Sequence, residues 1–462
     1  MTLSEIVLYA VLLLAFVGIA AGRLPHLRMN RAGIGLAAAA IVIALGALSM
    51  AEAFSAIDLG TIALLLSMML VVANLRLSGF FTAASSRILA AARTPRQLLA
   101  LVVLASGGLS AIFLNDTICI MLTPLVTEIC VRSRRDPVPY LVALAASANV
   151  GSCATIVGNP QNMLIGAQSG IPFLSFFASL APASLIGLAV CWLVIVIVIA
   201  FPGELRRGER ILYVPSPTID GARANKPLIA KSLVASALML FLLLVGVPPP
   251  VAALAAAALL LITSRIEPAR VFAEVDFSLL VFFSGLFIIT RSVEDTSAFK
   301  FVLQRSSTLV GGGLGALALF SGVTAILSNL VSNVPAVMLL KPLVPLFADH
   351  NRAWLVLALA STFAGNLTLL GSVANLIVAE GARRSGIDLR FGAFLRAGLP
   401  ITLLTLGIGT TWLLAYDEMD AHYVGPLDTA IERTEVEFFF HGYSFRIVMP
   451  RLLFEFCAVA HV

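Results

Sequence analysis

Charged residues are scarce in this chain. They make up 12% of its 462 residues, while 60% are apolar and the mean hydropathy is +1.01. A typical soluble domain carries roughly 25% charged residues, so this composition excludes an ordinary soluble protein. Many apolar runs instead approach the roughly 20 residues that a helix needs to cross a bilayer. We therefore expect an integral membrane protein that crosses the bilayer many times.

Residues typical of metal sites and active sites are also few. The five cysteines show no CxxC or CxxH spacing, and the five histidines fall in loops or in the C-terminal tail (Cys119, Cys130, Cys153, Cys191 and Cys457; His26, His350, His422, His441 and His461). HExxH, GxSxG and phosphate-binding GxxxxGKS or GxxxxGKT motifs are missing. We therefore expect no enzyme activity, no bound cofactor and no direct use of ATP. The net charge of +5 comes from arginines in short loops between apolar segments. This distribution follows the positive-inside rule of membrane proteins and does not indicate a nucleic-acid partner.

The arginines also predict a topology. Apolar segments run over about 5–22, 33–50, 58–77, 97–131, 139–166, 172–201, 228–247, 249–264, 277–292, 308–348, 353–380 and 391–416. The segments 97–131 and 308–348 are too long for one span. The first has arginines at both ends, so both ends lie in the cytoplasm, and it forms either two full spans or a re-entrant hairpin. Its halves, 97–113 and 117–131, hold only about 15 to 17 residues, which favours the hairpin.

The same charge rule divides the chain into two halves of opposite orientation. Basic residues place the linker 202–227 and two later loops in the cytoplasm, so that both ends of 308–348 lie outside (Arg206, Arg207, Arg210, Arg223, Lys226, Arg265, Arg270, Arg383, Arg384 and Arg390). Each half then reads as three spans, a hairpin and two further spans. This predicts an inverted-topology repeat with about ten spans and two hairpins. The halves are 1–201 and 228–416, and the tail 417–462 receives no function.

An internal duplication supports the two halves. Leu-Asn-Asp-Thr at 114–117 with Thr-Pro-Leu-Val at 123–126 matches Ser-Asn-Val-Pro at 332–335 with Lys-Pro-Leu-Val at 341–344, 218 residues later. Further residues match beyond the hairpins, in the interrupted spans 139–166 and 353–380 (Asn149 with Asn366, Gly158 with Gly371 and Asn162 with Asn375). Polar, helix-ending residues that recur in apolar surroundings indicate a membrane transporter.

These residues predict a binding site inside the membrane. Gly158 and Pro160 should open the span 139–166, because proline removes a backbone donor and glycine lowers helix stability. Freed carbonyls can hold a cation, and freed amides and helix N-termini can hold an anion. Such backbone is tolerated only where protein or a water-filled cavity surrounds it. The alternative for any single asparagine is a hydrogen bond that packs two helices.

Two charged residues stand out within the hairpins. Asp116 lies at the first tip, where an ionisable group is costly, and we expect it to bind a cation or to carry a proton. The alternative is a carboxylate that caps the returning helix. Lys341 lies in the second hairpin, and we expect its side chain to extend toward the outer interface.

The chain resembles a known superfamily. A hairpin with an asparagine tip, followed by Ala-Thr-Ile-Val-Gly-Asn-Pro-Gln-Asn at 154–162, is similar to the ion-transporter superfamily of divalent anion/sodium symporters, citrate carriers and ArsB-type arsenite permeases. The resemblance covers nearly all of residues 1–416. It implies an elevator-type carrier, usually a homodimer, in which a transport domain moves against a scaffold domain. Substrate and cation would bind near the hairpin tips.

The repeat and the resemblance together give two half-sites. The first comprises Ser110, Asn115, Asp116, Thr117, Asn149, Thr155, Gly158, Asn159, Pro160 and Asn162. The second comprises Ser332, Asn333, Val334, Asn366, Gly371, Ser372 and Asn375. A sodium ion is expected near Asn115, Asp116 and Gly158.

The tips depart from those of dicarboxylate symporters, which are similar to Ser-Asn-Thr at both positions. Here they read Leu-Asn-Asp and Ser-Asn-Val, closer to the arsenite permeases. We expect a secondary active transporter of a small anion or oxyanion in the cytoplasmic (inner) membrane, driven by Na⁺ or H⁺. One alternative is a cation/proton antiporter that uses Asp116. The other is an arsenite efflux permease, for which alone an ATPase partner is expected.

Overall fold

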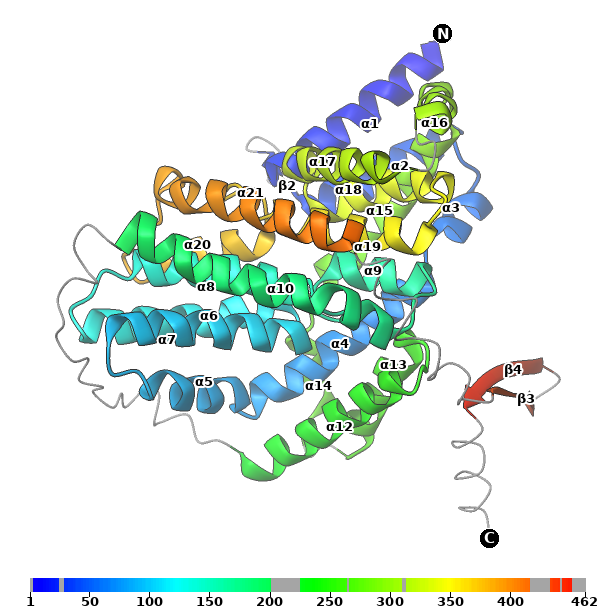
Figure 1. Ribbon diagram of the computed structural model, residues 1–462. Helices are drawn as coiled ribbons and strands as arrows, with labels where there is room; N and C mark the ends of the chain where they lie inside the picture. Colours follow the sequence, from blue (N-terminus) through cyan, green and yellow to red (C-terminus); the bar gives the residue numbers. More distant parts are fainter. Residues whose placement is uncertain are drawn as a thin grey trace.

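The computed structural model describes residues 3–24, 29–200, 225–263, 266–309, 313–415, 433–440 and 443–450 (Figure 1). Helices make up nearly all of this part, which confirms the expected helical membrane architecture. The described strands form two antiparallel pairs, β1 (Arg23–Leu24) with β2 (Met29–Asn30) and β3 (Arg433–Phe440) with β4 (Tyr443–Pro450). Residues 202–224 of the expected linker 202–227 lie outside the described residues. The same holds for the expected tail 417–462, apart from β3 and β4.

Seven of the described helices are long and apolar enough to cross a membrane. They are α4 (Leu59–Leu77), α6 (Pro95–Ile112), α10 (Phe173–Ile195), α12 (Lys226–Leu244), α15 (Phe277–Asp295), α17 (Leu314–Val331) and α21 (Phe391–Ala415). Shorter apolar helices are α1 (Leu3–Ala21), α2 (Arg31–Ala44), α8 (Val138–Ser152), α13 (Pro249–Thr263) and α18 (Asn333–Leu340). The inner segments are completed by α7 (Asn115–Arg132), α9 (Pro160–Gln168), α19 (His350–Ala364) and α20 (Val373–Arg384).

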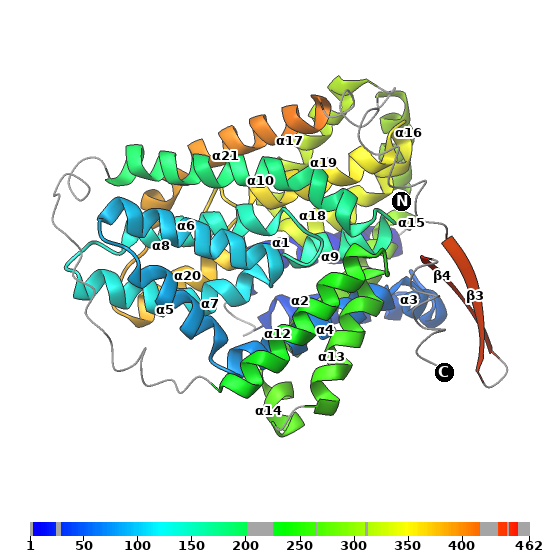
Figure 2. The same cartoon turned by 60° about the horizontal axis from the view of Figure 1, so that its bottom comes forward.

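The helices form two groups. We call α6–α10 with α17–α21 the hairpin body, and α1–α4 with α12–α15 the frame; α3 (Met50–Ala56) and α14 (Pro268–Ala273) are short members of the frame. Figures 1 and 2 show α10 lying along α21 in the hairpin body and α12 and α13 beside α4 in the frame. The two groups contain segments from both halves of the chain.

The first hairpin reaches the depth of the break in the following span. Near the start of α6 and α8, the Tyr140 hydroxyl donates to the Pro95 carbonyl (3.5 Å), and near their ends the Thr155 hydroxyl donates to the Ala111 carbonyl (2.5 Å). Because α8 has 15 residues, this shared length is about 22 Å, less than the roughly 30 Å of a bilayer core. The tip at 113–115 therefore lies beside the break at 153–159.

Close packing holds the first hairpin to this break. A Cβ atom on Gly151 of α8 would lie 2.1 Å from the Gly107 carbonyl oxygen of α6, so the two backbones touch where only glycine fits. The arms α6 and α7 each have 18 residues, more than the 15 to 17 expected. Arm length alone therefore does not separate a hairpin from two spans. The position of the tip beside the break at 153–159 is the arrangement that a hairpin requires.

The second hairpin is arranged in the same way. Its outer arm α17 ends beside the end of α19, where the Asn329 amide donates to the Ala364 carbonyl (2.9 Å). Its return arm is α18 followed by a 3-10 turn at Lys341–Leu346. The tip at Ser332 therefore lies beside the break between α19 and α20.

Two connecting helices were not expected from the sequence. Helix α5 (Phe80–Ala90) joins α4 to the first hairpin, and α16 (Ser297–Leu309) joins α15 to the second. Figure 1 shows them at opposite ends of the molecule. Each follows the last frame span of its half, so the two occupy equivalent places in the chain.

Candidate functional site

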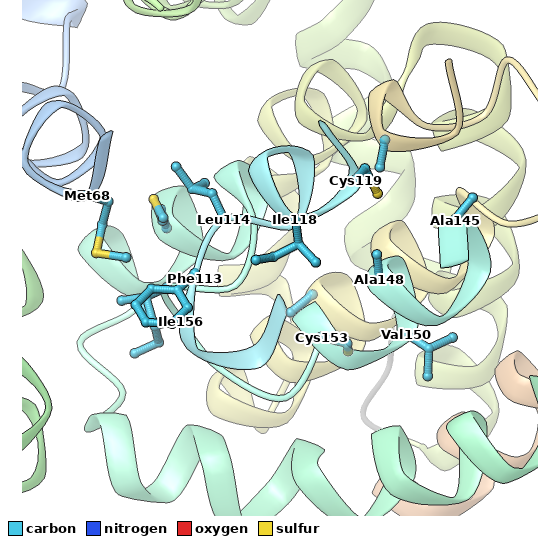
Figure 3. Close-up of a cluster of buried hydrophobic side chains, with 14 of the residues drawn as sticks. Met68, Phe113, Leu114, Ile118, Cys119, Ala145, Ala148, Val150, Cys153 and Ile156 are labelled. Atoms are coloured by element: carbon cyan, nitrogen blue, oxygen red, sulfur yellow. The ribbon is translucent and has the colours of Figure 1, made fainter. Parts of the chain in front are cut away.

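The first hairpin tip is held by its backbone and by an apolar support. The Asn115 backbone N–H donates to the Gly158 carbonyl in the break (3.0 Å). Below the tip, the Phe113 ring meets the Phe81 ring edge-on at 5.5 Å between centroids. Figure 3 shows Phe113 beside Ile156 of the break, with Met68 of α4 nearby. The tip is therefore held to the break by a backbone hydrogen bond and by apolar packing.

The break between α8 and α9 is closed by asparagines. The Asn159 side chain caps α9 by accepting from the Asn162 backbone N–H (2.8 Å), and Pro160 takes the first helical position, where no donor is needed. The Asn162 amide donates to the carbonyls of Ser152, Cys153 and Thr155. A Cβ atom on Gly158 would lie 2.2 Å from the Ser152 carbonyl oxygen. The break is thus a compact, hydrogen-bonded loop.

The second break repeats this arrangement. Ser372 caps α20 by accepting from the Ala374 backbone N–H (3.3 Å). The Asn375 amide donates to the carbonyls of Gly365 (2.8 Å) and Thr368 (3.0 Å), as that of Asn162 does in the first break. The Asn333 amide, oriented by its partners, donates to the carbonyls of Gly371 and Ser361. Matched residues therefore perform matched tasks.

Asn149 joins the two halves. Its amide nitrogen donates to the side-chain oxygens of Asn366 and Asn375, both at 3.0 Å. Its amide oxygen accepts from the Asn115 amide (3.2 Å) and the Ser372 hydroxyl (3.0 Å). Since these partners come from one tip and from the opposite break, Asn149 ties both half-sites into one unit.

A cavity of about 210 Å³ lies between the hairpin body and the frame. Both tips line it, as do the starts of α9 and α20 (Leu114, Asn115, Asp116, Thr117, Ser332, Asn333, Val334, Pro160, Gln161, Ser372 and Val373). The opposite wall comes from the frame (Arg31, Met69, Val72, Ala73, Arg76, Glu274, Asp276, Leu279 and Phe282). The two half-sites thus share one cavity, and the frame supplies most of its charge.

The sequence-predicted residues divide into two sets. Those that line the cavity are Asn115, Asp116, Thr117, Pro160, Ser332, Asn333, Val334 and Ser372. The others support the breaks from behind and are absent from the lining: Ser110, Asn149, Thr155, Gly158, Asn159, Asn162, Asn366, Gly371 and Asn375. The helix-packing alternative thus describes the second set well, while the first set is placed to contact a solute.

Asp116 is not the cap of its helix. Helix α7 begins at Asn115, whose side-chain oxygen accepts from the Asp116 backbone N–H (2.9 Å). The Asp116 carboxylate belongs to the first turn, where the helix dipole favours a negative charge, and it lines the cavity. At the matching position of the second tip stands Val334, so the two half-sites differ in charge.

The charged side chains that the frame contributes to the cavity wall were not predicted from the sequence. Arg76 and Glu274 form an ion pair at 2.8 Å. Arg31 is half-buried, and its Nε donates to the Ile19 carbonyl (3.1 Å). Each lies at the end of a span, where charges follow from topology alone. Their position at a site becomes visible only once the frame is folded onto the hairpin body.

Buried oxygens near the tips could serve a cation. In the described part, Ser110 and Asn162 of the first half and Ser328 and Asn329 of the second have side-chain oxygens without a hydrogen-bond partner. Ser328 was missed, although it precedes Ser332 by four residues as Ser110 precedes Leu114. Neutral oxygens of this kind suit Na⁺ and not a transition metal. Among the described residues no three His, Cys, Asp or Glu side chains gather to hold a metal ion.

Lys341 lies between the hairpin body and the frame, at the end of α4 opposite Arg76. It is half-buried, its Nζ donates to the Gln168 side-chain oxygen (3.4 Å), and it lies 5.7 Å from the centre of the Phe287 ring. Gln168 in turn donates to Asp58 at the start of α4 (3.0 Å). The side chain therefore bridges the hairpin body and the frame, away from the cavity.

Comparisons with known proteins agree with this architecture. A family model described as citrate transporter (CitMHS) matches residues 11–364. The silicon efflux transporter LSI3 of Oryza sativa subsp. japonica is 29% identical over 83% of this chain and 92% of its own length. A transporter named arsB from Dictyostelium discoideum is 27% identical over 83% and 87%. The YdaH transporter of Alcanivorax borkumensis shares the fold over 90% of this chain and 98% of its own, with a TM-score of 0.56 at 13% identity.

Proposed function

Because the chain belongs to the citrate transporter family (CitMHS), we propose that this membrane transporter is a secondary active carrier of a small anion or oxyanion, driven by Na⁺ or H⁺. Membership places it among transporters and not enzymes, within the superfamily that the sequence resembles. We place it in the cytoplasmic (inner) membrane, as a homodimer by analogy with that superfamily.

The observation that carries the proposal is the shared cavity. Both hairpin tips and both helix starts after the breaks open into it, so helix N-termini and amide groups can face one bound solute. Its volume of about 210 Å³ lies below the roughly 300–1,000 Å³ of sites for drug-sized ligands, which favours a small solute. Arg31 in its wall supports an anion.

The coupling ion is proposed to bind within the hairpin body. The unpartnered oxygens of Ser110 and Ser328 offer neutral ligands for Na⁺ at the two tips, and the carboxylate of Asp116 offers a site for Na⁺ or a proton. A cation bound there offsets the charge of the anion. The loaded body can then cross the membrane without exposing a net charge to lipid.

The cavity is proposed to face the cytoplasm in this structure. Arg87, Arg93 and Arg96 precede the first hairpin, and the positive-inside rule places them inside. Arg31 and Arg76 lie at the same ends of the frame spans, and they line the cavity. Movement of the hairpin body along the frame would carry the tips to the other side, which is the elevator form of alternating access.

Transport by the purified protein in liposomes tests this proposal. The panel is arsenite, sulfate, phosphate, citrate and succinate, each under an imposed Na⁺ gradient and, separately, an imposed pH gradient. We expect saturable movement of at least one solute under one gradient and its loss when the gradient is collapsed. Movement of none of them under either gradient would contradict the anion proposal.

Efflux of an uncharged oxyacid is a second candidate. Relatives carry the names silicon efflux transporter and arsB, and Val334 replaces the hydroxyl that a dicarboxylate would use at the second tip. Silicic acid therefore joins the panel, loaded inside the liposomes. The variant Asp116→Asn distinguishes an anion carrier from a cation/proton antiporter. In an antiporter it should abolish cation/proton exchange outright, whereas an anion carrier could still bind its substrate.

A further inference from the structure

Arg31 is an unusual residue in the wall of the cavity. It opens helix α2 of the frame, where the helix dipole is unfavourable to a cation. Its Nε donates to the Ile19 carbonyl at the end of α1 (3.1 Å), which fixes the plane of the guanidinium. Within the described residues, its terminal nitrogens have no hydrogen-bond or ion-pair partner. A half-buried cation in this setting calls for a negative charge.

The other charges of the cavity wall are already engaged. Arg76 pairs with Glu274 at 2.8 Å. Asp276 caps α15 by accepting from the Leu279 backbone N–H (3.3 Å). The carboxylate of Asp116 makes no ion pair and accepts no hydrogen bond in the part of the chain that the structure describes. Among the described residues, neither Arg31 nor Asp116 has an ion-pair partner, and the two lie on opposite walls of the cavity.

These two residues also lie in different parts of the fold. Arg31 belongs to the frame, and Asp116 belongs to the first hairpin tip. Their charges interact in the present arrangement, yet no ion pair within 4.0 Å joins them. If the hairpin body moves, Asp116 leaves the neighbourhood of Arg31, so the interaction exists in one state of the transport cycle only.

We propose that Arg31 is the frame counter-charge for Asp116, which takes the place of the coupling cation and so promotes its release into the cytoplasm. The inference rests on the proposed function, in which Asp116 binds Na⁺ or H⁺. While the body is loaded, the cation neutralises Asp116. Once the tips face Arg31, the guanidinium supplies that positive charge, and the cation is bound less tightly. Arg31 is a positioning residue here, since it acts through Asp116.

Several charged or titratable groups surround Asp116 and would affect its binding of a proton. The groups that face it across the cavity or lie one turn along its own helix are Arg31 of α2, Arg76 of α4, Glu274 after α14, Asp276 before α15 and Cys119 of α7. Arg76 and Glu274 cancel each other to a first approximation. Asp276 is exposed, and its carboxylate caps α15. Of the two cations in the wall, Arg76 is paired with Glu274, so Arg31 is the one best placed to compete with a proton or Na⁺ bound at Asp116.

Cation binding to the purified full-length protein in detergent tests this inference. Thermal stability is titrated with NaCl at constant ionic strength and, separately, with pH, to give an apparent affinity for each cation. We expect Arg31→Gln to tighten the affinity for the coupling cation about tenfold, or about 1.4 kcal/mol. Arg31→Lys, which keeps the charge, should stay near the wild type. Arg76→Gln combined with Glu274→Gln is the matched control, because it removes from the same cavity an ion pair whose charges cancel, and it should shift the affinity far less.

A double mutant separates this role from a structural one. In the Asp116→Asn background, Arg31→Gln should have no further effect on either titration, because the group through which it acts is gone. An unchanged affinity in Arg31→Gln, or an equal tightening with and without Asp116, would overturn the inference while leaving the proposed function intact. A wild-type protein that responds to neither cation would overturn the proposed coupling itself and this inference with it.

Discussion

Asn149 uses both ends of its amide in hydrogen bonds to four residues from both halves (Asn115, Asn366, Ser372 and Asn375). Replacement by leucine keeps the size but leaves these buried groups without partners, at a cost of about 1–3 kcal/mol for each group that finds none. We therefore expect Asn149→Leu to lower the unfolding temperature in detergent by several degrees and to abolish transport.

Asn74 provides a matched control. It is also fully buried, but its amide donates only to the Leu70 carbonyl of its own helix (2.9 Å), and its oxygen is already without a partner. Asn74→Leu should therefore change stability little. Equal losses in the two variants would show that Asn149 has no special connecting role.

Ser332 has a backbone conformation that favours glycine. Its φ of 79° and ψ of 159° lie in a region that costs a residue with a Cβ atom roughly 1–3 kcal/mol. Ser332→Gly should raise the unfolding temperature, since it removes this strain, and should weaken substrate binding, since it removes a hydroxyl from the cavity. Ser372→Gly should do the opposite to stability, because Ser372 has an ordinary φ of −139° and caps α20. A lower unfolding temperature of Ser332→Gly would contradict the claim that the Ser332 backbone is strained.

The internal repeat marks most residues that form the hairpin tips and the breaks, because they occur in both halves of the sequence. It did not separate those that line the cavity, such as Asn333, from those that brace the breaks, such as Asn162. That distinction depends on the direction of each side chain. Direction is set by the helix caps and by packing across the repeat, which one sequence does not reveal.

At the scale of the elements, the break between α8 and α9 is the feature most sensitive to a small change. A Cβ atom on Gly158 would meet the Ser152 carbonyl oxygen at 2.2 Å and displace the loop that holds the first tip. We expect Gly158→Ala to abolish uptake into liposomes and to lower thermal stability. Gly108→Ala in α6 should be neutral or slightly stabilising, because nothing lies within 4 Å of its added Cβ atom. Normal uptake by Gly158→Ala would show that the loop tolerates movement.

The elements themselves were largely predictable, with informative exceptions. Apolar runs and arginines locate the spans, and the glycine and proline residues locate the breaks. The helices α5 and α16 were missed because they are short and mix polar with apolar residues, so they give no hydropathy signal. Interruptions were expected at Gly158 and Pro160 and, in the second half, at Gly371. Whether the carbonyls of 153–159 and 365–372 are free or bound to asparagine amides follows only from the fold.

At the scale of the whole molecule, charged side chains interact across the boundary between the hairpin body and the frame. On the side away from the cavity, Lys341 contacts Gln168 of its own body and interacts with the carboxylates of Asp58 and Glu294 in the frame. These interactions exist in the present arrangement, and the proposed movement of the hairpin body would break them. They should therefore stabilise the inward-facing state.

Lys341→Met tests this contribution. We expect the outward-facing population to rise by about fivefold or less, since a partly exposed charge interaction is worth at most about 1 kcal/mol. External labelling of a cysteine at position 117 measures it. Lys300→Met is the control, because Lys300 is exposed and pairs with Asp295 at the end of α15, within the same half of the fold. Equal labelling of both variants would contradict a role for Lys341.

The proposed transport mechanism requires one cavity that both hairpin tips share. It is tested most directly by single cysteines in place of Thr117 and Val334, which line that cavity from the two tips, in a protein without its native cysteines. An impermeant maleimide should reach both positions from the cytoplasmic side in the inward-facing state, and a transported solute should slow both reactions. Labelling of the two positions only from opposite sides of the membrane, in every condition, would contradict the shared cavity.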